Sequence, residues 1–200
     1  MTITTTAAAT AVVFDLAPAA RQVVRLLDGV PDARLDAPTP CAAFTVRDLL
    51  AHLMGVSAEF RAAAGKRQAP QPAEGPALAP DWRRALPRRL TALAEAWHGR
   101  DAWRGTTRAD GVTLPAGVAA QVALDELVLH GWDLARATGQ PFRCDRASLQ
   151  VVYALLAPEA DNPARTPMFG PVVDVPYGSP FVDRVVGLGG RDPQWTPSRV

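Results

Sequence analysis

The sequence predicts an all-α protein, a four-helix bundle with long connections. Four segments repeat apolar residues at the spacing of a helix that buries one face. Prolines and glycines gather between these segments, most densely in residues 65–80, which we expect to form a loop. A hydrophobic fraction of 48% over 200 residues is enough for one buried core. Bundles of this kind place metal sites on facing helices.

The first two helices have recognisable starts. Asp15 is a predicted N-cap for a helix that ends near Gly29. The second helix covers residues 45–64 and begins at Thr45, which forms with Asp48 the pattern of a capping box. Such a box satisfies backbone N–H groups that the first turn leaves without partners.

The next two helices are predicted over residues 81–98 and 116–138. The last of these ends at Gly139, a residue type that readily adopts the left-handed conformation of a helix C-terminus. Between them, residues 99–114 are polar and contain glycine, with a short extended segment expected around residues 111–114.

Beyond the bundle, a fifth helix is predicted over residues 145–156 and a last short helix over residues 181–188. Between them lies a Pro-rich segment in which residues 172–175 form a short strand or an extended cover. We therefore expect three parts, which are a frayed N-terminus over residues 1–14, the bundle over residues 15–157, and a mostly irregular tail over residues 158–200 packed on it.

Charge and composition exclude several classes of protein. Lys and Arg number 21 against 20 Asp and Glu, so the net charge of +1 argues against a nucleic acid as partner. No apolar run reaches the length that spans a membrane, and the first residues lack the basic start and apolar core of a signal peptide. The two cysteines make no disulfide framework, which favours a cytoplasmic protein with free thiols.

Glu126 and His130 are the residues most suggestive of chemistry. Their i, i+4 spacing places both side chains on one face of a helix, one turn apart. His52 borders the apolar stripe of another long helix. A half-buried carboxylate beside an imidazole must be paired, solvated or bound to a metal. From the spacing alone, a structural ion pair and a metal-binding corner remain equally open.

Two imidazoles and one carboxylate would leave coordination positions free on Zn²⁺, as catalytic sites do. Fe²⁺ also accepts this donor set. Asp133 could accept a hydrogen bond from an imidazole and so orient it, or it could pair with Arg136 or Arg47. Asp125 lies about 100° away from Glu126 around the helix, so Glu126 is the preferred ligand.

The two cysteines and the third histidine have weaker claims. Cys41 lies a few residues before the helix that bears His52, where it could line the mouth of the site, act as a nucleophile or simply pack. Cys144, at a helix start, carries no such indication. His98 is interpreted as a cation near a helix C-terminus.

Two stretches resemble a known family. The first runs from Pro38 to Leu53 and contains Phe44-Thr45-Val46-Arg47-Asp48-Leu49-Leu50-Ala51-His52, and the second runs from Glu126 to Gln140. Both are similar to the mycothiol-dependent maleylpyruvate isomerase N-terminal domain family of the DinB superfamily. Phe169-Gly170-Pro171 and Gly190-Arg191-Asp192-Pro193 resemble the tail of an actinobacterial, metal-binding subgroup. The resemblance covers residues 15–195.

The resemblance implies a DinB-like four-helix bundle with a divalent metal at His52, Glu126 and His130. The metal would be Zn²⁺, with Fe²⁺ or Ni²⁺ as alternatives, and mycothiol or a related low-molecular-weight thiol would be the co-substrate. Homodimers are plausible in such bundles. The family's isomerase has an additional C-terminal domain for which this chain shows no counterpart, so isomerisation of maleylpyruvate itself does not follow.

Three functions are compatible with these residues. The first is a metal-dependent thiol enzyme, an S-transferase or isomerase acting on a small electrophilic molecule, with Asp133 orienting a ligand. The second is a thiol-independent hydrolase, cyclase or isomerase that tailors a secondary metabolite. The third is a non-catalytic, metal-containing protein that binds a small molecule. In the enzyme readings, residues 65–80 and 158–180 are candidate lids.

Overall fold

Among the described residues, the structure has six α-helices, three short 3-10 helices and one short hairpin. The computed structural model describes residues 13–69, 77–109, 111–162, 165 and 169–197. Residues 1–12 of the expected frayed N-terminus, and parts of both candidate lids, lie outside the described residues.

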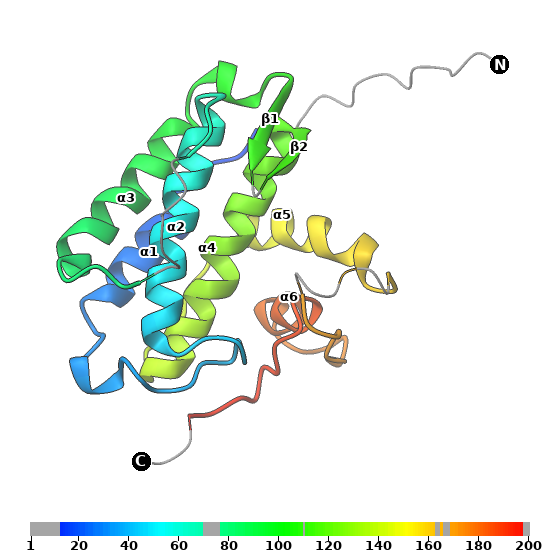
Figure 1. The fold of residues 1–200 in the computed structure, drawn as a ribbon. Coiled ribbons are helices and arrows are strands. Elements are labelled where there is room, and N and C mark those ends of the chain that lie inside the picture. Colours follow the sequence, from blue (N-terminus) through cyan, green and yellow to red (C-terminus); the bar gives the residue numbers. More distant parts are fainter. Residues whose placement is uncertain (1–12, 70–76, 110, 163–164, 166–168, 198–200) are drawn as a thin grey trace.

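The first four helices form the predicted bundle, as Figure 1 shows. They are α1 (Ala17–Leu27), α2 (Val46–Ala64), α3 (Trp82–Ala96) and α4 (Ala116–Thr138). A hairpin of β1 (Thr106–Ala109) and β2 (Val112–Pro115) joins α3 to α4, and its strands pair antiparallel. The all-α prediction is confirmed.

Local sequence explains where the helices begin and end. Thr45 Oγ1 accepts from the backbone N–H of Asp48, and the Asp48 carboxylate accepts from the backbone N–H of Thr45, which completes the predicted capping box. Gly139 ends α4 with φ of 71°, a conformation that glycine adopts without strain. The prediction for α1 needs a correction, because Leu16 is its N-cap and Asp15 instead accepts from the N–H of Ala17.

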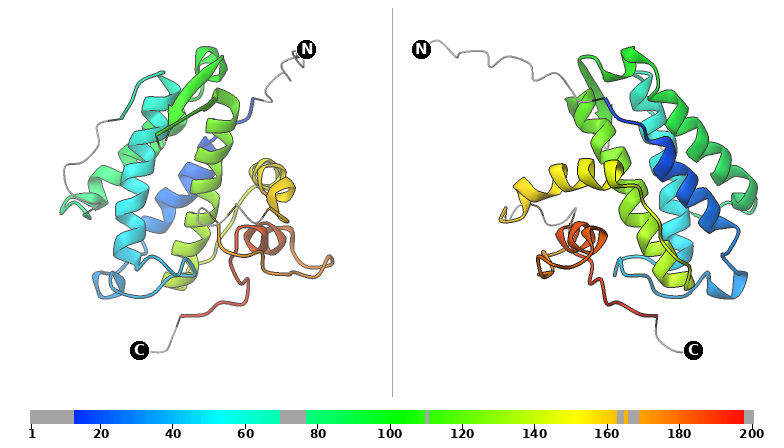
Figure 2. Two further views of the ribbon diagram at one scale, coloured as in Figure 1. Left: turned by 45° about the vertical axis from the view of Figure 1, so that its right-hand side comes forward. Right: turned by 180° about the vertical axis from the view of Figure 1, so that it is seen from behind.

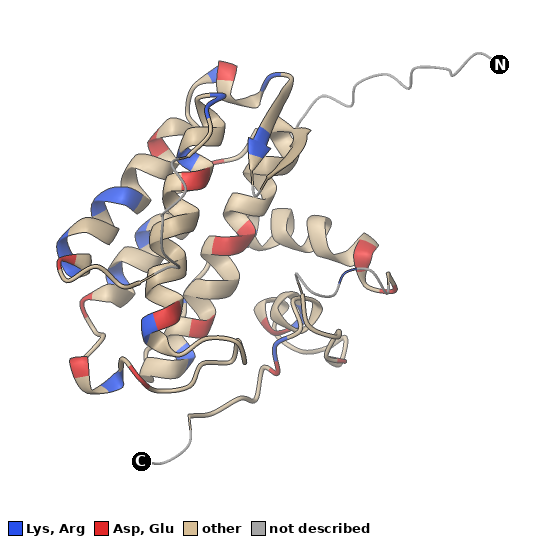
Figure 3. Ribbon diagram, in the orientation of Figure 1, with Lys and Arg blue, Asp and Glu red and all other residues tan. Residues whose placement is uncertain are grey.

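Helix α4 is the centre of the molecule. It is buried on nearly every side, and most of its ribbon carries no charge (Figure 3). Leu124, Val128 and Leu134 have no exposed surface at all. A helix that is apolar all round belongs in the interior, whereas the other helices bury a single face. The few polar groups on α4 therefore require partners.

Helices α5 (Arg146–Leu156) and α6 (Phe181–Leu188) lie outside the bundle, next to α4 (Figures 1 and 2). The chain between them is extended around residues 172–175 but pairs with no described strand, so the cover was the correct alternative. Val173 donates its N–H to the carbonyl of Gly187 and so fixes this cover to α6. No helix among the described residues is both long and apolar enough to cross a membrane.

Candidate metal centre

Three side chains converge between α2 and α4. Nε2 of His52 lies 2.9 Å from Oε2 of Glu126, and Nε2 of His130 lies 3.2 Å from the same oxygen. The imidazole rings of the two histidines meet edge to face, with centroids 4.7 Å apart. One atom from each residue lies within 4.8 Å of the others, so the three sequence-predicted ligands form one cluster.

The cluster fits a divalent cation in both chemistry and spacing. Nitrogen and carboxylate oxygen are ligands of zinc, and two atoms bound to one tetrahedral zinc ion lie about 3.3 Å apart at the usual bond lengths. The separations of 2.9 and 3.2 Å are close to this value. The side chains of His52 and Glu126 are 29% and 23% exposed, so the cluster opens to solvent on one side.

The helices position these side chains. The capping box fixes the first turn of α2, and His52 follows two turns later. Helical geometry places Glu126 and His130 one above the other on α4. Phe44, in the connection before α2, closes one wall of the cluster, because its ring centroid lies 5.0 Å from that of His52 and 5.9 Å from that of His130.

Asp133 holds the far side of the His130 ring. Its Oδ2 lies 3.0 Å from Nδ1 of His130, and its side chain has no exposed surface. This contact requires a proton on Nδ1 and turns Nε2 toward Glu126. Of the two alternatives that the sequence left open for Asp133, the structure has the contact with an imidazole. The arginine that pairs with Asp133 is Arg191, not Arg136 or Arg47.

Arg191 reaches this position from the turn after α6. Its Nη2 and Nε donate to the two oxygens of Asp133 at 3.0 and 3.3 Å, and Nη1 donates to the carbonyl of Gly189 at 2.6 Å. The preceding residue, Gly190, has φ of 80°, and a Cβ there would lie 2.8 Å from Gly170. The turn that delivers Arg191 therefore requires glycine.

The charges of the cluster depend on one another. Burial acts to raise the pKa of Glu126, but hydrogen bonds from His130 and His52 outweigh it and hold this pKa below its usual range. Burial acts to lower the pKa of His130, but hydrogen bonds to Asp133 and Glu126 raise it to about 9. His130 is therefore protonated at neutral pH in the metal-free protein, and a cation would have to displace that proton.

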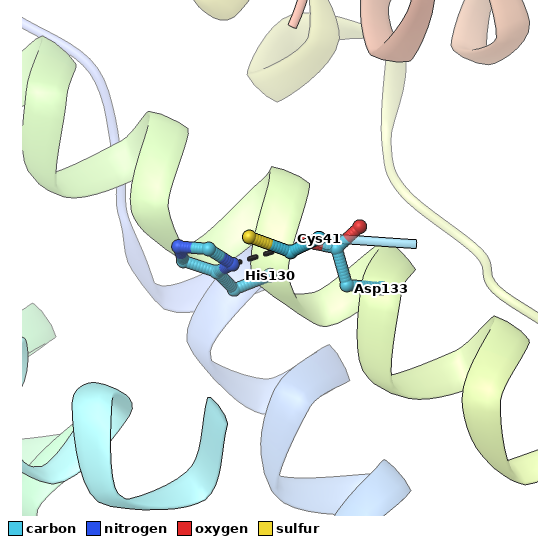
Figure 4. A group of neighbouring side chains, drawn as sticks. All are labelled: Cys41, His130 and Asp133. Carbon is cyan, nitrogen blue, oxygen red and sulfur yellow. Dashed lines mark hydrogen bonds and ion pairs between the residues drawn. The ribbon is translucent and has the colours of Figure 1, made fainter. Parts of the chain in front are cut away.

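Cys41 lies on the Nδ1 side of His130. Its thiol, His130 and Asp133 again offer three atoms within 4.8 Å of one another, and Figure 4 shows the sulfur beside the ring. Burial raises the pKa of the Cys41 thiol, although Arg191 acts in the opposite direction. A thiol that stays protonated is a weak nucleophile, which favours a lining role.

The remaining candidates lie apart from the cluster. Asp125 belongs to neither group of ligand atoms, and its buried Oδ1 has no hydrogen-bond partner among the described residues. Burial, followed by repulsion from Glu126, raises its pKa to about 8. His98 is exposed and contacts Asp15 at 3.4 Å. Cys144 lies at the start of α5.

Sequence reasoning missed Arg191 and Phe44 as parts of the centre. Arg191 is distant in sequence and belongs to no helical stripe, so periodicity cannot place it. The flanking Gly189-Gly190 pair was the one local indication that a tight turn presents it.

Comparison with known proteins identifies a family and two relatives. A family model described as the mycothiol maleylpyruvate isomerase N-terminal domain matches residues 16–135. Two relatives, both named as uncharacterized proteins of Mycobacterium tuberculosis, are 29% identical over 171 residues, which cover 83% of this chain and 90% of theirs. No solved structure matches the chain.

Proposed function

The chain belongs to the mycothiol maleylpyruvate isomerase N-terminal domain family, and from this membership we propose that it is a metal-dependent enzyme that uses a thiol of the mycothiol type. The observation that carries the proposal is the cluster of His52, Glu126 and His130, whose donor atoms converge and remain open on one side. The substrate would be a small electrophilic molecule, and the reaction an S-transfer or an isomerisation by addition and elimination.

Each residue of the centre has a distinct part in this proposal. His52, Glu126 and His130 hold the cation, which is Zn²⁺ by the preference of the donor set, with Fe²⁺ or Ni²⁺ as alternatives. A divalent cation in such a site lowers the pKa of a coordinated thiol and polarises a carbonyl. Asp133 keeps the proton of His130 on Nδ1, so that Nε2 is free to bind.

The surroundings support a site for a reactive sulfur. Phe44 covers the two imidazoles on one side and limits access of water to them. The side chain of Arg191 is buried in its ion pair with Asp133, and its charge balances that carboxylate behind His130. With a divalent cation bound, such a partly closed site would favour the thiolate form of a small thiol that enters it.

The decisive experiment measures metal content and thiol binding together. Untagged protein is analysed for bound metal, and mycothiol is titrated by calorimetry before and after chelation. We expect about one metal ion per chain and thiol binding that disappears with the metal. In His52→Ala, metal affinity should fall by more than about 100-fold. His98→Ala is the matched control, because His98 is exposed and outside the cluster.

Other outcomes identify the alternatives. Metal binding without thiol binding would contradict the thiol reading and favour the thiol-independent tailoring enzyme. Metal and thiol binding without turnover of any electrophile would favour a binding protein. A chain that takes up no metal even after reconstitution would show that Glu126 and the histidines form a structural ion cluster, and the proposal would fail.

A further inference from the structure

A hollow lined largely by arginine lies between α1 and the connection from α4 to α5. Its volume is about 350 Å³. Arg21 and Arg25 line it from one face of α1, one turn apart, and Arg143 lines it from the connection. The right-hand view of Figure 2 shows α1 and the start of α5 on the same side of the molecule.

The arginines of this hollow lack the aspartate partners that several other arginines of the protein have. Within the described residues, Arg21, Arg25 and Arg143 form no salt bridge, whereas five other arginines each pair with an aspartate. Asp145 is the acidic residue of the lining, held by hydrogen bonds from Ser148 at the start of α5, and its single charge offsets only one of the three positive charges. Like charges one turn apart on a helix repel each other, so an anion would relieve a real cost.

An apolar hollow continues from the basic one. Its volume is about 420 Å³, and it shares Arg143 and Cys144 with the first. Four apolar side chains line it: Phe142, Leu149, Phe181 and Val182. Arg146 lies at its edge, with the guanidinium 5.7 Å from the centroid of the Phe181 ring. The two hollows together offer a cationic end and an apolar end.

We infer that this groove, lined by Arg21, Arg25 and Arg143 and by Phe142 and Phe181, binds a soluble organic phosphate with an apolar group. Guanidinium groups match the oxygens of a phosphate in pairs, and three of them suit a doubly charged ester. The apolar group would lie on the two phenylalanines. Hollows of this size correspond to a small molecule rather than to a macromolecular surface.

The groove is separate from the metal centre. His52 and Glu126 lie between α2 and α4, whereas the groove is built from α1, the α4–α5 connection, α5 and α6. None of its residues belongs to the ligand cluster. Arg143 and Phe181 also lie beyond residues 16–135, the part that matches the family. The inference therefore stands or falls independently of the proposed function.

Phenyl phosphate is a direct probe of both ends. In a calorimetric titration at low salt we expect saturable binding of one molecule per chain with a dissociation constant of about 1 mM or lower. Inorganic phosphate lacks the ring and should bind at least about fivefold more weakly, and uncharged benzyl alcohol should bind least. Absence of saturable binding of phenyl phosphate would overturn the inference.

Variants separate the two ends of the groove. Arg143→Gln should weaken phenyl phosphate binding by about tenfold or more, because a charge-assisted hydrogen bond is lost. Arg21→Gln, on the other wall, should do the same and serves if the first variant folds poorly. Phe181→Ala should reduce phenyl phosphate to the affinity of inorganic phosphate. Arg88→Gln, an exposed arginine on α3 outside the groove, is the control.

Two further measurements can refute the assignment. Binding in His52→Ala should equal that of the natural chain, and its loss there would place the anion at the metal centre instead. Vesicles containing a phosphate-headgroup lipid should not bind; if they bind while phenyl phosphate does not, the arginines serve a membrane surface and the small-molecule inference is wrong.

Discussion

The candidate metal centre and the arginine groove arrange their charged groups in opposite ways. In the centre, Asp133 has no exposed surface and contacts Arg191 and His130, and Glu126 contacts His52 and His130. In the groove, three exposed arginines line two facing walls and have no carboxylate partner among the described residues.

The difference follows from the cost of burial. A charge without a partner inside a protein loses its hydration and gains nothing, so each group in the centre persists only as part of a chain of contacts. At the surface, water and salt screen like charges, so the groove can hold three arginines without a carboxylate partner at small cost. Removing one charged side chain should therefore lower the free energy of unfolding strongly in the centre and hardly change it in the groove.

The largest effect is expected at Arg191. Arg191→Ala leaves the buried Asp133 without its cation, which should lower the free energy of unfolding by about 3–5 kcal/mol in a denaturant titration. Metal affinity should fall by about 10- to 100-fold, since His130 loses a fixed orientation. Arg104→Ala is the control, because its pair with Asp101 is exposed and worth at most about 1 kcal/mol. An equal loss of stability in Arg191→Ala and Arg104→Ala would refute the difference between buried and exposed ion pairs.

The next effect depends on pH and concerns Cys144 in the wall of the groove. Burial, followed by the charge of Asp145, raises its pKa from 9.0 to about 12. The unfolded chain releases the thiol proton from about pH 9 upward while the folded chain retains it, so stability falls as the pH rises through this window. Cys144→Ser should reduce that loss by about 1–2 kcal/mol near pH 10.5. Denaturant unfolding of both proteins at pH 8 and pH 10.5 measures this difference. The same loss of stability between the two pH values in the natural chain and in Cys144→Ser would contradict the prediction.

A smaller effect is expected at the start of α2, the helix that carries His52. Thr45→Ala removes the capping box and should cost about 1 kcal/mol of stability. Metal affinity should change by less than about twofold, because core packing holds the rest of the helix. Thr91→Ala, an exposed position within α3, provides the control for the substitution itself. A large loss of metal would show that the helix end, rather than the core, positions His52.

The smallest expected effect is a gain in stability rather than a loss. Arg21→Gln relieves repulsion with Arg25 and should stabilise the protein by about 0.2–0.5 kcal/mol at low salt. The gain should disappear at high salt, where surface charges are screened. Unfolding curves at two ionic strengths measure it. Destabilisation at low salt would show that Arg21 has a structural partner and that the groove is less unbalanced than its geometry indicates.

The helices were largely predictable because their causes are local. The apolar spacing of residues 116–138, the box at Thr45 and Asp48 and the glycine at 139 each act within a few residues, and α2 and α4 begin and end where these features indicate. The hairpin was half predicted, since β1 carries little apolar alternation. Asp15 was misassigned by one residue as the N-cap of α1.

The candidate site was predictable only where a helix carries it. Glu126 and His130 follow from the period of α4, and His52 from the family resemblance. The partner of Asp133 could not be found in this way, because Arg191 lies 58 residues away and in no periodic segment. The groove could not be predicted from the sequence either, because the segments that carry its arginines are far apart in the chain.

The contact between Arg191 and Asp133 also limits where this chain can be cut to make a shorter fragment. The match to the family model ends at residue 135, and a fragment cut there would be a natural choice for expression or for grafting into a chimera. Such a fragment would keep every proposed ligand and Asp133 but lose the cation that neutralises Asp133. A fragment that keeps the centre intact therefore has to extend at least to residue 191, 56 residues beyond the end of the family-model match.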